Sequence, residues 1–370
     1  MSAGMNGKAA VLAGEREVEI VDIEDRPEIE ENAVFTRVKR SNVCGSEIHF
    51  WKGEFPVPPG AVLGHEAVLE IDELGEGVTE DSAGNPVKEG DTITPVYFNP
   101  CRGCSACSNG QFYACDIVKS TGDWMQPHQI EPYFRGTFAT HYYIQPQQQF
   151  YKVPDGIPGH VAAGANCALS QVLFGFEKAD LRQGENVVIQ GAGGLGINAI
   201  AVAKESNANV IVVEGADNRI ERAKEFGADH VIDLKEYGDS EQRVRRVQEL
   251  TGGEGADVGM EVAGIPEAFV EGANMLRNGA RYIELGNIST QLKTEFSPAD
   301  LTLQRITVHA LLFYQPWYLN KALSFLERHV DDYPYEELLD AEFPLEEAQT
   351  ALEKSDKQEF TRASLIPEHE

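Results

Sequence analysis

The segment "VVIQGAGGLGINAI" (residues 187–200) places a glycine-rich turn between an apolar strand and a helix. Its glycines follow the order G-x-G-x-x-G: the first permits a tight turn, the second lets the backbone approach a pyrophosphate, and the third lets the helix pack on the strand. Free N–H groups at the start of the helix favour an anion. The segment predicts a dinucleotide-binding turn, with a glycine-rich turn in another α/β protein as the alternative. The candidate coenzyme contacts are Gly191, Gly193, Gly194, Leu195 and Gly196.

The chain after this turn alternates between strand-like and helix-like segments. Such alternation predicts parallel strands joined by crossover helices, as in a Rossmann domain. The next strand, "VIVVE", ends at Glu214, roughly 20 residues after the first glycine, where a carboxylate can accept hydrogen bonds from the adenosine ribose and repel the extra phosphate of NADP. We therefore expect NAD as the coenzyme, and Arg219 close behind keeps NADP as the alternative.

The residues before about 160 form short β-branched segments divided by glycine, proline and asparagine, which predicts a mostly β unit with long loops. One of these loops, "NPCRGCSACSNGQFYACD" (residues 99–116), carries four cysteines spaced x2, x2 and x7. Four thiolates can close a tetrahedral zinc site without leaving a position for a substrate. We therefore expect a structural zinc here rather than free buried thiols. The expected ligands are Cys101, Cys104, Cys107 and Cys115.

Two further cysteines lie outside this loop, Cys44 in "NVCGSEIHFW" and Cys167 in "ANCALSQVLFGF". With His65 of "VLGHEAV" they would supply two thiolates and an imidazole to a zinc ion, and a fourth position would stay open for water or an alcohol. Spacing alone does not establish this set, because a lone cysteine or histidine is more often a residue of the core. The residues by themselves leave both interpretations open.

Length and charge limit the remaining possibilities. A chain of 370 residues is too long for one hydrophobic core, so we expect two domains. The formal net charge of −29 disfavours nucleic acid or an anionic membrane as a partner, and its spread over an ordinary globular composition favours a halophilic protein adapted to strong salt. No apolar run is long enough to cross a bilayer and the N-terminus lacks a secretory pattern, so we expect a cytoplasmic protein that contacts no membrane.

Taken together, these motifs resemble the zinc-dependent medium-chain alcohol and polyol dehydrogenases over nearly the whole chain. "VCGSEIHFWKG" is similar to the family's Cys-Gly-Ser/Thr-Asp-x-His segment, "LGHE" to its histidine-ligand motif, the four-cysteine loop to its structural zinc loop, and "PLEEAQTALEKSDK" to its C-terminal helix. The resemblance implies an α/β protein in which a GroES-like, mostly β catalytic domain (residues 1–160) precedes a Rossmann coenzyme domain (residues 161–303). Residues 304–370 would complete the catalytic domain.

The resemblance also implies a second metal site, which makes two zinc ions per chain. Cys44, His65 and Cys167 match the ligands of the family's catalytic zinc, and Glu66 matches an acidic neighbour that can approach the metal. Two positions depart from the usual pattern. Glu47 stands where members commonly carry an aspartate that orients a histidine ligand, and Cys167 stands where sorbitol-type members usually carry glutamate.

Further side chains match a proton relay and a coenzyme contact. Ser46 matches the hydroxyl that receives the substrate proton, His49 the next member of the relay by way of the nicotinamide ribose, and Arg362 in "FTRASLIP" a basic residue near the coenzyme pyrophosphate. The resemblance implies hydride transfer between a small alcohol or polyol, or its aldehyde or ketone, and NAD(P), with zinc as the Lewis acid. An aldose 1-dehydrogenase that yields a lactone and a non-catalytic redox sensor are the alternatives. The resemblance further implies a homodimer or a homotetramer, the assemblies that the family forms.

Overall fold

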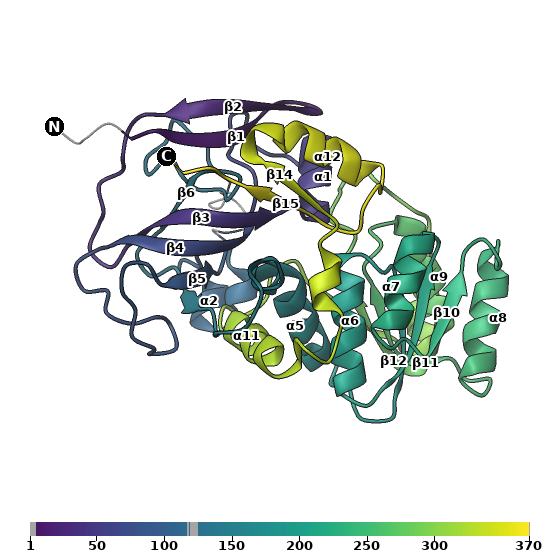
Figure 1. Cartoon of the computed structure of the whole chain (residues 1–370). Helices are drawn as coiled ribbons and strands as arrows, with labels where there is room; N and C mark the ends of the chain where they lie inside the picture. The colour runs from purple at the N-terminus through teal and green to yellow at the C-terminus, as the bar shows by residue number, and fades with distance from the viewer. Residues whose placement is uncertain (1–4, 117, 119–124, 370) are drawn as a thin grey trace. The chain divides into compact units, whose positions relative to one another are not determined.

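The computed structural model describes residues 5–116, 118 and 125–369. The chain forms two compact units, of which unit 1 comprises Met1–Ser170 with Gln315–Glu370 and unit 2 comprises Gln171–Tyr314. The C-terminal part of the chain thus returns to the unit that the N-terminal part begins, as the yellow and purple ribbons of Figure 1 show. The boundaries predicted after residues 160 and 303 lie earlier in the chain than those of the compact units, and the functional division that they describe stays a prediction.

Unit 1 is built on a seven-stranded sheet in the order β14-β15-β3-β4-β5-β7, with β6 also paired to β3. Strand β15 lies between β14 and β3, so the sheet is completed by a segment far along the chain. Strands β1 and β2 form a separate antiparallel hairpin. The strands of unit 1 are β1 (Gly7–Gly14), β2 (Glu17–Ile23), β3 (Val34–Asn42), β4 (Glu66–Leu74), β5 (Thr92–Pro95), β6 (His141–Ile144), β7 (Phe150–Lys152), β14 (Ala341–Pro344) and β15 (Ala363–Ile366).

The core of unit 1 forms where alternate residues of the long strands face inward. Val34 and Val38 of β3 pack with Leu69 and Ile71 of β4 in one fully buried cluster, as the two-residue period of a strand requires. Helical segments of 3 to 12 residues lie in the connections between the strands. They are α1 (Gly45–Trp51), α2 (Ser105–Ser108), η1 (Phe112–Ala114), α4 (Gly159–Ala163), the π-helical η2 (Ala165–Leu169), α11 (Tyr318–His329), η3 (Tyr335–Leu338), η4 (Leu345–Glu347) and α12 (Ala348–Asp356).

Unit 2 contains a six-stranded sheet in the order β10-β9-β8-β11-β12-β13, and every neighbouring pair is parallel. The order reverses between β8 and β11, which is where dinucleotides bind in open parallel sheets. This arrangement confirms the predicted Rossmann domain. Its strands are β8 (Asn186–Gln190), β9 (Asn209–Glu214), β10 (His230–Asp233), β11 (Ala256–Glu261), β12 (Leu276–Glu284) and β13 (Thr307–Ala310).

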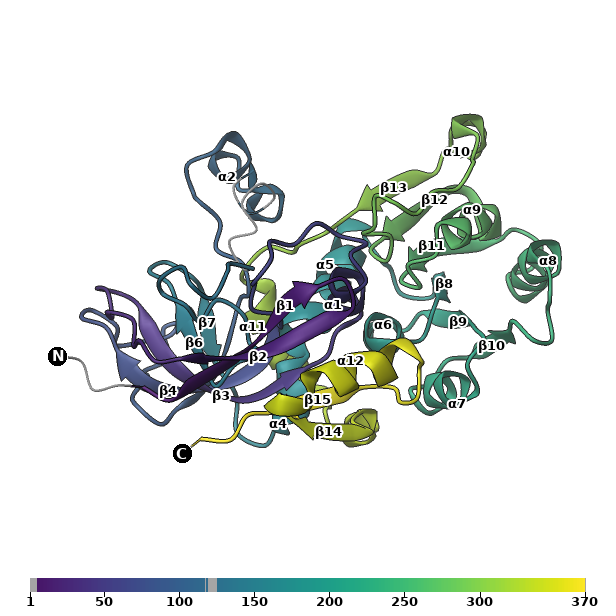
Figure 2. The same ribbon diagram turned by 90° about the horizontal axis from the view of Figure 1, so that it is seen from above.

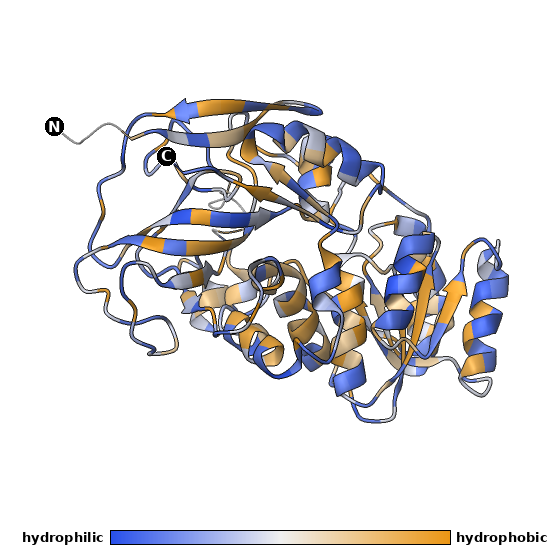
Figure 3. Ribbon diagram, viewed as in Figure 1, coloured by the Kyte–Doolittle hydropathy of each residue, from blue (hydrophilic) through white to orange (hydrophobic). Residues whose placement is uncertain are grey.

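Helices cover both faces of this parallel sheet, with α6 and α7 on one face and α8 and α9 on the other (Figure 2). The strands are mainly hydrophobic and α8 is mainly hydrophilic (Figure 3), because the strands are buried from both sides whereas a covering helix exposes one face. No helix within the described ranges is long and apolar enough to span a membrane. The helices are α5 (Ser170–Lys178), α6 (Gly194–Glu205), α7 (Asp217–Glu225), α8 (Ser240–Leu250), α9 (Pro266–Met275) and α10 (Pro298–Gln304).

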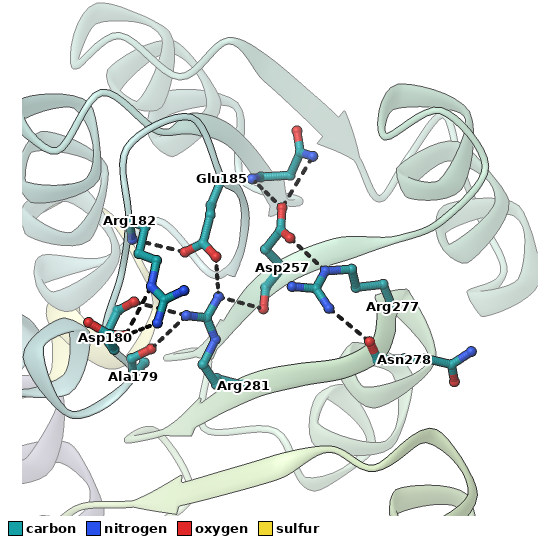
Figure 4. A network of polar contacts seen from close by, with 9 residues as sticks. Ala179, Asp180, Arg182, Glu185, Asp257, Arg277, Asn278 and Arg281 are labelled. Atoms are coloured by element: carbon teal, nitrogen blue, oxygen red, sulfur yellow. Dashed lines mark hydrogen bonds and ion pairs between the residues drawn. The ribbon is translucent and has the colours of Figure 1, made fainter.

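A charged network ties together the starts of three of these strands (Figure 4). Arg281 of β12 donates hydrogen bonds to the carbonyl oxygens of Ala179 and Asp180 at 3.0 and 2.9 Å and to Glu185 Oε1 at 2.6 Å. Asp257 of β11 accepts from Arg277 Nε at 2.6 Å. The guanidinium groups thus satisfy loop carbonyls that no regular structure would pair.

Candidate metal centres and coenzyme turn

Four side chains of unit 1 converge on one point: Cys44, His65, Glu66 and Cys167 each place a potential ligand atom within 4.8 Å of the others. Cys44 Sγ lies 4.0 Å from Cys167 Sγ, and His65 Nε2 lies 3.3 Å from Cys167 Sγ. Bond lengths typical of zinc would separate two sulfurs by about 3.8 Å and a sulfur and a nitrogen by about 3.6 Å in a tetrahedron. The two thiols and the imidazole therefore fit zinc and leave a fourth position for another ligand.

Each of these side chains is held by local structure. Cys44 is the N-cap of α1, and His65 directly precedes β4. Cys167 lies in the π-helical turn η2, an irregularity that often occurs at functional sites. The Asn166 side chain fixes this turn, because its Nδ2 donates to the carbonyl oxygens of His65 and Pro95 at 2.8 and 2.9 Å. Sequence reasoning missed Asn166, because an asparagine next to a cysteine matches no metal motif.

Glu47 orients the histidine despite its longer side chain. Glu47 Oε1 lies 2.5 Å from His65 Nδ1, and Oε2 accepts the Cys44 backbone N–H at 2.9 Å. The Glu47 side chain is 1% exposed, so both bonds form away from water. This contact leaves His65 Nε2 directed at the two sulfur atoms. The departure from the usual aspartate thus preserves the contact with the ligand histidine.

The pKa shifts in the cluster show which ligands would lose a proton when a metal ion binds. The hydrogen bond with Cys167 lowers the pKa of Cys44 well below its ordinary value although burial opposes this, and it raises the pKa of Cys167. Burial alone would lower the pKa of His65, but Glu47 and Cys44 beside it raise this pKa to about 10. A metal ion binding here must displace protons from Cys167 and His65, because ligands bind in their deprotonated forms.

The predicted relay residues lie on α1, which begins after Cys44. Ser46 Oγ is buried and has no hydrogen-bond partner within the described part of the chain. It lies beside the Cys44 thiol and contributes to lowering the pKa of that thiol. His49 is about one quarter exposed at 24%, and its Nδ1 lies 2.6 Å from Glu54 Oε2. The helix thus carries a buried hydroxyl and a partly exposed imidazole, as a path from a metal site to solvent requires.

Arg362 lies against Glu66, where the two side chains form a short ion pair. Glu66 is fully buried and the Arg362 side chain is 10% exposed. The guanidinium also lies beside Gly164, where a Cβ would be 3.4 Å from Arg362 Nη2. In this arrangement Arg362 compensates the charge of the carboxylate next to the metal ligands, and its predicted contact with the coenzyme pyrophosphate stays a prediction.

The second cluster brings together Cys101, Cys104, Cys107 and Cys115, whose sulfur atoms all lie within 4.8 Å of one another. All six cysteines of the chain are free of disulfides. Cys104 is the N-cap of α2, and its backbone N–H donates to Cys101 Sγ at 3.3 Å. Backbone N–H groups lower the pKa of Cys104 to about 6. Four sulfurs in this arrangement fit a closed zinc site.

Gln315 anchors this loop from a distant part of unit 1. Its Oε1 accepts the Phe112 N–H at 3.0 Å and its Nε2 donates to the Gly110 carbonyl oxygen at 2.6 Å. The Phe112 ring also makes a T-shaped contact with the Trp317 ring, with ring centroids 6.0 Å apart. Sequence reasoning missed Gln315, because its role depends on a fold that returns the chain to the loop.

The glycine turn of unit 2 has the backbone that the sequence predicts. Gly191 has φ +101°, a conformation that side chains disfavour, and a Cβ on Gly196 would lie 2.0 Å from the Gly191 carbonyl oxygen. Gly193 is the N-cap of α6, so Gly194 and Leu195 provide its first turn. The N–H groups at this end of α6 form a site suited to a pyrophosphate.

Glu214 and Arg219 flank this turn. Glu214 Oε2 accepts the Ala192 N–H at 2.8 Å, and Oε1 accepts the N–H groups of Gly215 and Ala216 at 2.7 and 3.0 Å. The carboxylate is thus fixed at the end of β9. The Arg219 guanidinium lies beside Gly193 and adds positive charge next to the turn. A Cβ atom placed on Gly193 would be 4.0 Å from the Arg219 guanidinium carbon.

Comparison with known families matches both parts of the chain. Residues 30–155 match the alcohol dehydrogenase GroES-like domain, and residues 194–328 match the zinc-binding dehydrogenase domain. The two matches confirm the predicted pairing of a GroES-like domain with a Rossmann domain.

Individual relatives extend over most of the chain. The chain is 33% identical to a 5-exo-hydroxycamphor dehydrogenase of Pseudomonas putida over 94% of both chains, and 32% identical to a sorbitol dehydrogenase of Halalkalibacterium halodurans over 82% of this chain and 84% of the relative. The crystal structure of an alcohol dehydrogenase from Thermotoga maritima superposes with a TM-score of 0.89 at 28% identity, over 99% of this chain and 100% of that chain. The protein therefore belongs to the family of zinc-binding medium-chain alcohol and polyol dehydrogenases.

Proposed function

We propose that this dehydrogenase transfers hydride between an alcohol or polyol and NAD(P) at a zinc ion held by Cys44, His65 and Cys167. The observation that carries the assignment of the site is the convergence of two sulfurs and one imidazole nitrogen at tetrahedral spacing. The Glu47 carboxylate behind His65 supports it, because metal-bound histidines usually donate their other N–H to such a partner. The loop of Cys101, Cys104, Cys107 and Cys115 is assigned a second, structural zinc.

Each side chain near the site takes a role that its surroundings allow. Zinc would supply the Lewis acidity that lowers the pKa of an alcohol, and NAD(P) would take up the hydride. Ser46 accepts the alcohol proton, because its Oγ is buried beside Cys44. His49 passes the proton to water, because its side chain is partly exposed. Glu66, paired with Arg362, supplies negative charge next to the ligands and can approach the metal.

NAD is the coenzyme that we propose over NADP. The Glu214 carboxylate is fixed by three backbone N–H groups at the end of β9, where its charge would repel a ribose phosphate. Arg219 lies beside Gly193, where it would contact the pyrophosphate instead. Fluorescence titrations with NADH and NADPH test this proposal, and tighter binding of NADPH would contradict it.

The decisive experiment follows NADH absorbance when the zinc-loaded protein, in concentrated KCl, is mixed with NAD and panels of primary alcohols, secondary alcohols, polyols and aldoses. Turnover of alcohols or polyols is expected, and a lactone product from aldoses alone would identify an aldose dehydrogenase instead. His65→Ala should abolish turnover while NADH binding persists, because the histidine belongs to the metal site. Turnover by this variant would refute the assigned catalytic zinc.

The acidic composition supports a proposal about the medium in which the protein works. A net charge of −29 is repulsive at low ionic strength, whereas at molar salt the Debye length is only about 3 Å. We expect the midpoint of urea unfolding to rise as KCl increases from millimolar to molar concentration. Full stability in dilute buffer would refute a halophilic, salt-rich cytoplasm as the setting. Light scattering in the same buffers tests the proposed homodimer or homotetramer.

A further inference from the structure

His49 has a carboxylate partner to which the proposed reaction assigns no task. His49 Nδ1 lies 2.6 Å from Glu54 Oε2, a short distance for a hydrogen bond between a ring nitrogen and a carboxylate. The two side chains are exposed to similar extents, 24% and 25%, so both reach water while remaining partly enclosed.

The backbone brings these two residues together through the way in which α1 ends. Gly53 has φ +71°, and its N–H donates to the Phe50 carbonyl oxygen at 3.0 Å, while the Glu54 N–H donates to the His49 carbonyl oxygen at 2.9 Å. This pair of hydrogen bonds defines a Schellman motif, which stacks the side chain after the glycine on the side chain four residues before the glycine. In most proteins that contact is hydrophobic. Here it joins an imidazole and a carboxylate.

The surroundings hold this turn in place. Phe50 follows His49 and Phe55 follows Glu54 in the sequence; the centroids of the two rings lie 5.3 Å apart, and Phe50 is 2% exposed. Trp51 Nε1 also donates to Gln349 Oε1 of α12 at 3.3 Å. Because both the helix and the residue after the turn are packed, the His49–Glu54 contact is set by the fold and is not a chance pairing of two mobile surface side chains.

We propose that Glu54 is a positioning residue of the proton relay, which holds the His49 imidazole with its proton on Nδ1 and keeps Nε2 free to accept the proton that leaves the alcohol. An ionised carboxylate can only accept a hydrogen bond, so Nδ1 must donate to it. In a neutral imidazole the other nitrogen is then the acceptor. This inference rests on the proposed dehydrogenase function and adds to it the residue that sets the direction of the relay.

The proton transfer is balanced within this pair. His49 Nε2 gains one proton, while the proton on Nδ1 remains bonded to Nδ1 and hydrogen-bonded to Glu54. The imidazolium that forms therefore faces a carboxylate of opposite charge. Nε2 then releases the proton to water and the imidazole returns to its starting tautomer. A carboxylate that holds the tautomer and stabilises the imidazolium has the same physical role behind the histidine of serine proteases.

A spectroscopic test of the tautomer does not depend on activity. The long-range ¹H–¹⁵N spectrum of ¹⁵N-histidine-labelled, zinc-loaded protein in alkaline buffer should show His49 with its proton on Nδ1, with the signals assigned by their loss in His49→Asn. In Glu54→Gln the amide can either accept or donate, so the two tautomers should mix. Asp332→Asn is the matched control: it alters another histidine–carboxylate pair in the last turn of a helix, where His329 Nδ1 lies 2.9 Å from Asp332 Oδ2, and should leave the His49 signals unchanged.

Kinetics provide the second test. Glu54→Gln should lower kcat by about tenfold to a hundredfold with little change in KM, zinc content or NADH affinity, because only proton transfer is affected. In the His49→Asn background the same substitution should have no further effect. An unchanged tautomer in Glu54→Gln, or a further loss of kcat in the double variant, overturns the inference. A wild-type protein that is inactive on every substrate would instead contradict the proposed function, and the spectrum would still report on the pair.

Discussion

Replacement of Glu47 by glutamine should weaken zinc binding at the proposed catalytic site while leaving the proposed four-cysteine site intact. The Glu47 carboxylate supplies two acceptor oxygens, one to His65 Nδ1 and one to the Cys44 N–H. An amide supplies only one acceptor oxygen, so its NH₂ group must face one of these two donors, and the position is shielded from water because the Glu47 side chain is 1% exposed. Loss of such a partner typically weakens metal affinity tenfold to a hundredfold, which corresponds to about 1.4–2.8 kcal/mol.

Competition with a zinc chelator measures this effect, with the zinc that remains per chain determined by elemental analysis. The four-cysteine site serves as an internal reference because it lies outside the Glu47 network. Glu47→Asp keeps the charge and should lose less affinity than Glu47→Gln. Glu54→Gln removes a carboxylate from the end of the same helix without touching His65 and should lose none. Zinc affinity within twofold of wild type in Glu47→Gln would refute the reasoning.

Three further predictions concern zinc content and stability. Cys107→Ser removes a ligand of the four-cysteine cluster, so elemental analysis should find one zinc per chain in place of two, and two would contradict a metal in that loop. Arg281→Met leaves Glu185 Oε1 and two loop carbonyls without the donor that Arg281 provides, and should lower the free energy of unfolding in urea by about 3 kcal/mol. Arg182→Met is the control: the Arg182 side chain is 70% exposed, so its loss should lower the same free energy by less than about 1 kcal/mol, and equal losses would contradict this assignment. Burial and the neighbouring Glu284 raise the pKa of Glu261 to about 8, so the stability that protonated Glu261 contributes is complete below its unfolded pKa of about 4.3 and is lost as pH rises through about 8. Between about pH 4.3 and pH 8 the thermal midpoint should therefore fall more steeply in wild type than in Glu261→Gln, and parallel curves over this range would show that Glu261 is not the group responsible.

The coenzyme domain could be predicted in detail because its determinants are local. The glycine turn needs a positive φ at Gly191 and close packing at Gly196, and both requirements can be read from consecutive residues. Alternating strand and helix segments then restrict the topology to a few arrangements. The four-cysteine loop is similar, since all its ligands lie within one short segment.

The catalytic site could be predicted only through family resemblance. Cys44, His65 and Cys167 come from three separate segments, and spacing cannot show that β4 and the π-helical turn meet. Asn166 and Gln315 act by donating to backbone carbonyls elsewhere in the fold, so neither carries a motif. Glu54 is an intermediate case, because the glycine before it marks a helix end but does not show that a carboxylate will face His49.

Because β15 lies between β14 and β3, the two units complete their folding in a set order during synthesis. During translation, residues 171–314 emerge from the ribosome as an uninterrupted unit that can fold as soon as it is complete. The sheet of unit 1 must wait, because Ser41 and Asn42 of β3 pair with Leu365 and Ser364, which are made more than three hundred residues later. In that interval the end of β3 is an open strand edge able to pair with another nascent chain.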